Sequence, residues 1–132
     1  MAVQALAKGV RMNPRKVSVV AGLVRGRTVA DALVILDHTP RAAALPVKKA
    51  IESARANADH NHKFKPDTLR IVEITVTAGV RLKRYRPAAR GRALPFQRGT
   101  SHIKVVVDGE KRAPKKPTAE KAKENKEAKE TK

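Results

Sequence analysis

One segment of the chain, residues 78–102, has almost no apolar pattern that could form a hydrophobic core, although the residues on both sides of it have one. The flanking residues alternate between apolar and polar side chains, which predicts a strand before the segment and a strand after it. The side chains expected to face the core are Val72, Ile74 and Val76 in the first strand and Ile103, Val105 and Val107 in the second. A loop of this length inside a small domain is unusual unless it has a function. We therefore predict a long β-hairpin that extends beyond the sheet.

Two prolines and a glycine indicate how this hairpin turns. Pro87 and Pro95 cannot donate a backbone hydrogen bond, so we expect strand pairing to fail near them. Gly91 lies midway between them and tolerates the positive φ that a tight turn requires. The predicted turn is therefore at Arg90–Gly91.

The hairpin segment is basic throughout and contains no acidic residue. Its cations are Arg81, Lys83, Arg84, Arg86, Arg90, Arg92 and Arg98. Arginine predominates, and guanidinium groups bind phosphates in bidentate fashion and stack on bases, which favours structured RNA as the partner. Because an isolated two-stranded ribbon is marginally stable in water, we expect this arm to become ordered against an anionic partner.

The composition of the whole chain supports a nucleic-acid partner. Thirty Lys and Arg residues against twelve Asp and Glu give a formal net charge of +18, which a polyanion would neutralise. The absence of cysteine excludes disulfides and fits a reducing, cytoplasmic location. No apolar run approaches the ~20 residues of a membrane span, so no membrane partner is expected. With only Phe64, Tyr85 and Phe96 as aromatics, a module that reads single strands through several stacked bases is not expected.

The rest of the sequence predicts one α+β domain over residues 1–107, followed by a Lys/Glu-rich disordered tail over 108–132. Helices are expected after Asn13-Pro14, after Thr28 and after Thr39-Pro40. Pro46 suggests that the third regular helix begins near Leu45 or has a bent first turn. A third strand near Val3 and Ala5 would complete a small antiparallel three-stranded sheet packed on about three helices.

Three other functions are suggested by parts of the sequence. The letters HNH at His60–His62 resemble the name of a nuclease motif, but no cysteine or suitable carboxylate pair supports a metal, so neither catalysis nor a cofactor is expected. A DNA-binding architectural protein that inserts a basic β-ribbon into a minor groove is the main alternative. A basic membrane-surface peptide fits less well, because the most basic segment contains prolines. No homo-oligomer is expected.

Four stretches in the order "RMNPRKV", "LVRGRTVADAL", "SARANADHNH" and "LKRYRPAARGRALPFQRGTSHI" resemble the bacterial-type large ribosomal subunit protein twenty-two family. The resemblance extends from Val3 to Val107. It implies a small α+β domain with a long β-hairpin that binds 23S-type ribosomal RNA and contacts neighbouring large-subunit ribosomal proteins. It also implies that the hairpin lines the nascent-peptide exit tunnel, so that its tip meets the nascent polypeptide.

The resemblance also implies roles for individual residues. The implied RNA-binding residues are Arg11, Arg15, Lys16, Arg25, Arg27, Arg81, Lys83, Arg84, Arg86, Arg90, Arg92, Arg98, Thr100, Ser101 and His102. The implied tunnel tip consists of Pro87, Ala88, Ala89, Arg90, Gly91, Arg92 and Ala93. Ala88, Leu94, Gln97 and Gly99 depart from residues that are common in the family, which makes the returning arm less charged.

Overall fold

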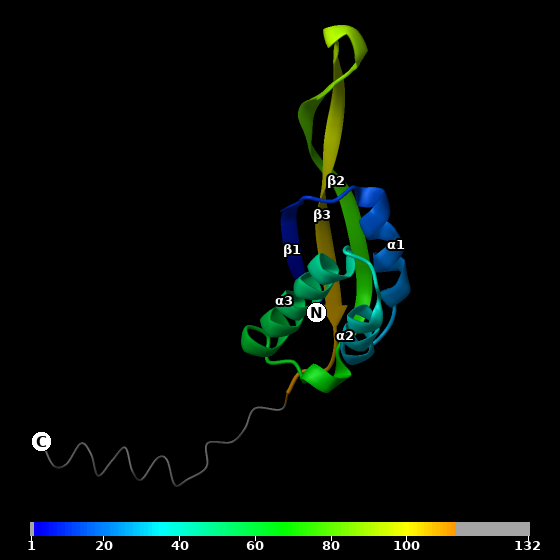
Figure 1. Ribbon diagram of the computed structural model, residues 1–132. Coiled ribbons are helices and arrows are strands. Elements are labelled where there is room, and N and C mark those ends of the chain that lie inside the picture. Colours follow the sequence, from blue (N-terminus) through cyan, green and yellow to red (C-terminus); the bar gives the residue numbers. More distant parts are fainter. Residues whose placement is uncertain (1, 113–132) are drawn as a thin grey trace, which may run out of the picture.

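The computed structural model describes residues 2–112 of the chain. The elements follow in the order β1 (Val3–Val10), α1 (Pro14–Val24), α2 (Val29–His38), α3 (Ala44–His60), the 3-10 turn η1 (Pro66–Thr68), β2 (Arg70–Pro87), the 3-10 turn η2 (Ala89–Gly91) and β3 (Ala93–Asp108). The three strands form an antiparallel sheet in the order β1-β3-β2, and the helices pack on it as a second layer (Figure 1). The predicted α+β class with three strands and three helices is confirmed.

The first helix begins at the Asn13-Pro14 pair that the sequence indicated. The side-chain oxygen of Asn13 accepts a hydrogen bond from the backbone N–H of Arg15 at 3.1 Å, and Pro14 occupies the first helical position. Gly26 adopts a positive φ of 75° just after the helix, and its N–H donates to the carbonyl of Ile71 at 3.1 Å. The apolar stripe of α1 is entirely buried and comprises Val17, Val20, Ala21 and Val24.

Helices α2 and α3 begin in different ways, since α2 has a side-chain cap and α3 has none. Thr28 accepts the N–H of Asp31 at 3.2 Å and donates its hydroxyl to the Asp31 carboxylate at 2.7 Å, so it caps the start of α2. Helix α3 begins at Ala44, one residue before the predicted start. Pro46 is therefore the third helical residue, where a backbone N–H has no acceptor within the helix, so it interrupts no helical hydrogen bond.

The prediction that Val72 of β2 faces the core is wrong. Ile71 pairs with Val107 and Glu73 pairs with Val106, so Val72 is an extra residue in a β-bulge and is 58% exposed. The bulge shifts the inward face to Ile71 and Ile74, which are both buried. The inward face of β3 is confirmed, since Ile103, Val105 and Val107 are fully buried.

Beyond the sheet, β2 and β3 continue as a two-stranded ribbon that projects from one end of the domain (Figure 1). The expectation that pairing fails at the prolines is wrong, because Tyr85 pairs with Pro95 and Pro87 pairs with Ala93. In a two-stranded ribbon each strand has a free edge, and a proline whose nitrogen faces that edge removes no ladder hydrogen bond.

The turn lies where the glycine predicted it. Within η2, Gly91 has a φ of 68° and Arg90 also adopts the left-handed conformation, with a φ of 59°. The N–H of Ala88 donates to the carbonyl of Arg92 at 2.7 Å and closes the turn.

The described chain continues past Val107, the last residue of the expected domain. After β3, the N–H of Arg112 donates to the carbonyl of Lys63 at 2.7 Å, and the N–H of Lys65 donates to the carbonyl of Glu110 at 2.9 Å. These bonds hold residues 110–112 against the segment that contains the buried Phe64. The remainder of the predicted tail, 113–132, lies outside the described residues.

The base of the ribbon requires a glycine, which leads to a stability prediction. A Cβ atom on Gly79 would lie 2.5 Å from Oγ1 of Thr100, whose hydroxyl donates to the Val80 carbonyl at 2.6 Å. We expect Gly79→Ala to lower the free energy of unfolding by about 1–3 kcal/mol, because overpacking must displace this hydroxyl. Gly22→Ala is the control, since its added Cβ would meet no other part of the described fold within 4 Å and alanine stabilises a helix by roughly 0.5–1 kcal/mol relative to glycine. Urea denaturation of both variants would contradict the account if Gly79→Ala matched the parent protein.

Candidate nucleic-acid interface

Strand pairing sorts the side chains of the ribbon onto two faces. In an antiparallel pair, residues directly opposite each other share a face, as do residues two positions apart. We call one side the guanidinium face, which consists of Leu82, Arg84, Arg86, Leu94, Phe96 and Arg98. We call the other side the small-residue face, which consists of Arg81, Lys83, Tyr85, Pro87, Ala93, Pro95, Gln97 and Gly99.

Charge and size differ between the two faces. The guanidinium face carries three arginines interleaved with three large apolar side chains, and all three arginines are exposed. The small-residue face has its two cations, Arg81 and Lys83, near the domain, and towards the tip it carries only Tyr85, two prolines and an alanine. The ribbon therefore presents cations along its whole length on one side only.

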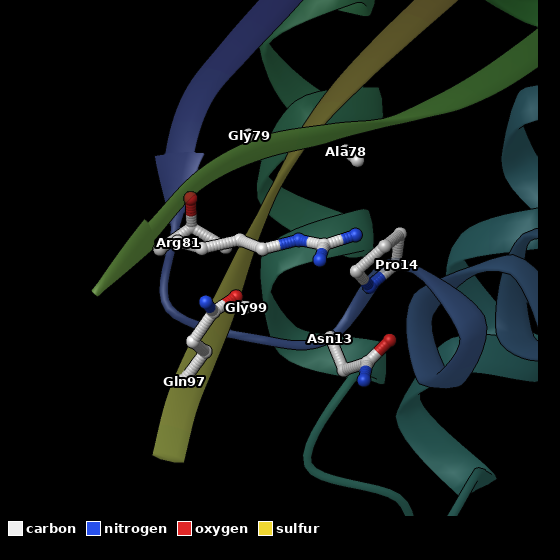
Figure 2. A pocket seen from close by; sticks show the side chains of 8 residues that line it. Asn13, Pro14, Ala78, Gly79, Arg81, Gln97 and Gly99 are labelled. Carbon is white, nitrogen blue, oxygen red and sulfur yellow. The ribbon is translucent and has the colours of Figure 1, made fainter. Parts of the chain in front are cut away.

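A second group of cations gathers where the ribbon leaves the domain. Figure 2 shows a pocket of about 250 Å³ in which the Arg81 guanidinium reaches towards Pro14 at the start of α1. Two adjoining hollows are lined by Arg11 and Arg98, and one of them also by Lys16. The fold thus brings four predicted RNA-binding residues together near the start of α1 from segments that are far apart in the sequence.

The predicted Thr100, Ser101 and His102 lie at the base of the ribbon but mostly inside the sheet. Thr100 is 7% exposed and Ser101 is fully buried, with no hydrogen-bond partner for its hydroxyl among the described residues. His102 accepts the N–H of Gly9 at its Nδ1 atom, at 2.9 Å, where β1 has an irregular register. These side chains fix the direction in which the ribbon leaves the domain.

Four further predicted residues lie on α1 or just after it. Arg15 and Lys16 are exposed in its first turn, near the ribbon. Arg25 and Arg27 follow its other end, where Arg25 donates to the carbonyl of Ile74 and Arg27 donates to the carbonyl of Leu23, both at 3.0 Å. These two are therefore separated from the ribbon by the length of the helix.

Sequence reasoning did not select Lys104, which is exposed on the sheet face opposite to the buried side chains of β3. Lys104 lies between two apolar residues of the predicted strand, Ile103 and Val105, and this alternation already indicated that its side chain faces away from the core. Lys48, in contrast, is neutralised by Asp37, whose hydrogen bond raises the pKa of the lysine. Lys48 is thus a poor candidate for a phosphate contact.

The acidic groups lie away from this interface. Over residues 2–112, the paired carboxylates contact domain cations, as in the ion pairs Asp59–Arg112 and Glu110–Lys65. Within the same residues no cluster of three or more His, Cys, Asp or Glu could hold a metal ion, and His62 instead lies beside Phe64 with ring centroids 6.3 Å apart. No helix among the described residues is long and apolar enough to cross a membrane.

Fold and charge together define a basic α+β protein whose charged ribbon extends beyond its hydrophobic core. Comparison with known proteins narrows this class: the model of the family described as ribosomal protein L22p/L17e matches residues 5–108. The chain belongs to this family of ribosomal proteins, as the resemblance of its motifs indicated.

Curated relatives agree with this assignment. The large ribosomal subunit protein uL22 of Oceanobacillus iheyensis is 49% identical over 111 residues, which cover 84% of this chain and 98% of the relative. The protein of the same name from Desulfitobacterium hafniense is 50% identical over 104 residues, which cover 79% of this chain and 91% of the relative. The protein of the same name from Clostridium tetani is 48% identical over 107 residues, which cover 81% of this chain and 96% of the relative. These relatives are ribosomal proteins and not enzymes.

The arrangement of cations predicts a strong dependence of RNA binding on salt. If the ribbon and its base neutralise about six phosphates, log K for binding to RNA should fall with log salt with a slope of about −4, at ~0.7 per single-strand contact. Filter binding at a series of KCl concentrations would measure it. A slope near zero would show that these cations do not contact phosphates.

Proposed function

We propose that the protein binds the 23S-type RNA of the large ribosomal subunit through its ribbon and the cations at the base of the ribbon. In this role it acts in the cytoplasm as a structural constituent that stabilises subunit assembly. The observation that carries the proposal is the paired ribbon itself, which bears seven cations and no acid and lies outside the hydrophobic core. Contact with a polyanion would relieve the electrostatic self-repulsion of such a ribbon.

The same ribbon supports a role at the nascent-peptide exit tunnel. Its tip, residues 87–93, contains three alanines and a glycine, so it occupies little volume, while Arg90 and Arg92 can anchor it to phosphates. A slender, anchored turn can reach between RNA segments without blocking a passage. The nascent polypeptide and neighbouring large-subunit proteins are therefore the further partners that we propose.

Sedimentation tests the proposed partner directly. A tagged copy should co-migrate with the large ribosomal subunit in a sucrose gradient at moderate salt and leave that fraction after ribonuclease treatment. Migration at the top of the gradient without ribonuclease, or association with DNA that deoxyribonuclease releases, would contradict the proposal. The second outcome would favour an architectural DNA-binding protein.

The tip arginines can be tested without straining the turn. Arg90→Gly removes the charge and retains the positive φ, and Arg92→Ala removes the second charge. We expect this double variant to enter large subunits at least about tenfold less well in competition with the parent protein, because charge-assisted hydrogen bonds contribute roughly 1.5–3 kcal/mol each. Lys49→Ala with Arg55→Ala is the control, since it removes two charges from α3. Equal incorporation of both double variants would argue against a tip contact.

A further inference from the structure

The two accessible aromatic rings of the ribbon lie on opposite faces and in different surroundings. The sequence has two phenylalanines, one tyrosine and no tryptophan. Phe64 is buried in the core, so Tyr85 and Phe96 remain accessible. Tyr85 is 72% exposed on the small-residue face, opposite Pro95. Phe96 is half-buried on the guanidinium face, although no helix or third strand of the described chain covers this part of the ribbon (Figure 1).

The neighbours of Phe96 explain its partial burial. Arg84 lies directly opposite it across the ribbon, and the guanidinium carbon of Arg86 lies 5.6 Å from the centre of its ring. Arg98 and Leu94 flank it along the same strand and on the same face. The ring is therefore held by a cation–π contact with Arg86, and Arg84 and Arg98 share its face of the ribbon.

A ring in such surroundings has the properties of a nucleobase platform. Proteins that hold unpaired nucleotides combine an aromatic face, on which a base stacks, with cations that bind the adjacent phosphates. We propose that Phe96, with Arg86 against its ring, stacks an unpaired base of ribosomal RNA, while Arg84 and Arg98 bind the neighbouring phosphates. This inference rests on the proposed RNA-binding function and assigns the guanidinium face, rather than the small-residue face, to the RNA.

A structural role for Phe96 gives a different expectation. If the ring served only to hold Arg86, its loss would act through a phosphate contact and would change the salt dependence of binding. Stacking involves no counterion release, so loss of a stacked base lowers the affinity at every salt concentration and leaves the slope unchanged. The two roles can therefore be separated in one titration series.

The test uses the full chain and protein-free large-subunit ribosomal RNA as the probe. Phe96→Leu retains an apolar side chain without an aromatic face, and we expect about tenfold weaker binding with an unchanged slope of log K against log salt. Phe96→Tyr should restore binding to within about twofold of the parent protein. Tyr85→Leu is the matched control on the other face and should bind like the parent protein.

Three results would overturn the inference. Phe96→Leu could bind as tightly as the parent protein, it could lose no more affinity than Tyr85→Leu, or it could lower the salt slope. The last result would make Phe96 a positioning residue for Arg86. If the parent protein itself did not bind the RNA, both the proposed function and this inference would fail. If the parent protein bound but Phe96→Leu bound equally well, only this inference would fail.

Irradiation of assembled subunits provides a second readout. Short-wave ultraviolet light joins stacked bases to aromatic side chains, and mass spectrometry after nuclease and protease digestion identifies the modified residue. We expect a nucleotide adduct on Phe96 and none on Tyr85, even though Tyr85 is highly exposed. An adduct on Tyr85 without one on Phe96 would assign the RNA to the opposite face.

Discussion

Repulsion among like charges on the two-stranded ribbon is the constraint on which the rest of the structure depends. Seven cations share two paired strands and their turn without an acidic residue, and no third element of the described chain covers them. A strong anchor at its base would hold such a ribbon, and a polyanion along its length would relieve the repulsion. The domain supplies the first requirement and ribosomal RNA, in our account, supplies the second.

The ribbon is anchored because its two strands continue without a break into the core sheet. β2 and β3 are core strands at one end, where Ile74 and Val105 are paired and buried, and the same two strands become the exposed ribbon at the other. At the boundary, Gly79 leaves room for Thr100, while the β1 irregularity lets Gly9 bond to His102. The ribbon thus leaves in a direction set by the core, and the cations of α1 lie beside it.

Features that depend on local chemistry could be predicted from the sequence, whereas features that depend on strand pairing could not. The caps at Asn13 and Thr28 and the turn at Gly91 need only neighbouring residues, so they were predicted correctly. The bulge at Val72 and the ladder past Pro87 depend on the register between two strands, which periodicity within one strand cannot show. For the same reason, the basic residues of the candidate site could be proposed from the sequence, but the sequence did not show which of them share a face of the ribbon.

The most direct test of the account locates the tip relative to RNA. The chain has no cysteine, so Ala89→Cys, at the turn, can carry a single tethered iron chelate that cleaves nearby RNA, and Ser53→Cys on the exposed side of α3 serves as the reference position. In assembled large subunits, we predict strong cleavage at a few internal sites of the ribosomal RNA from the tip, distinct from those cleaved from α3. Absence of cleavage from the tip, in subunits that contain the labelled protein, would contradict the claim that the ribbon lies within RNA.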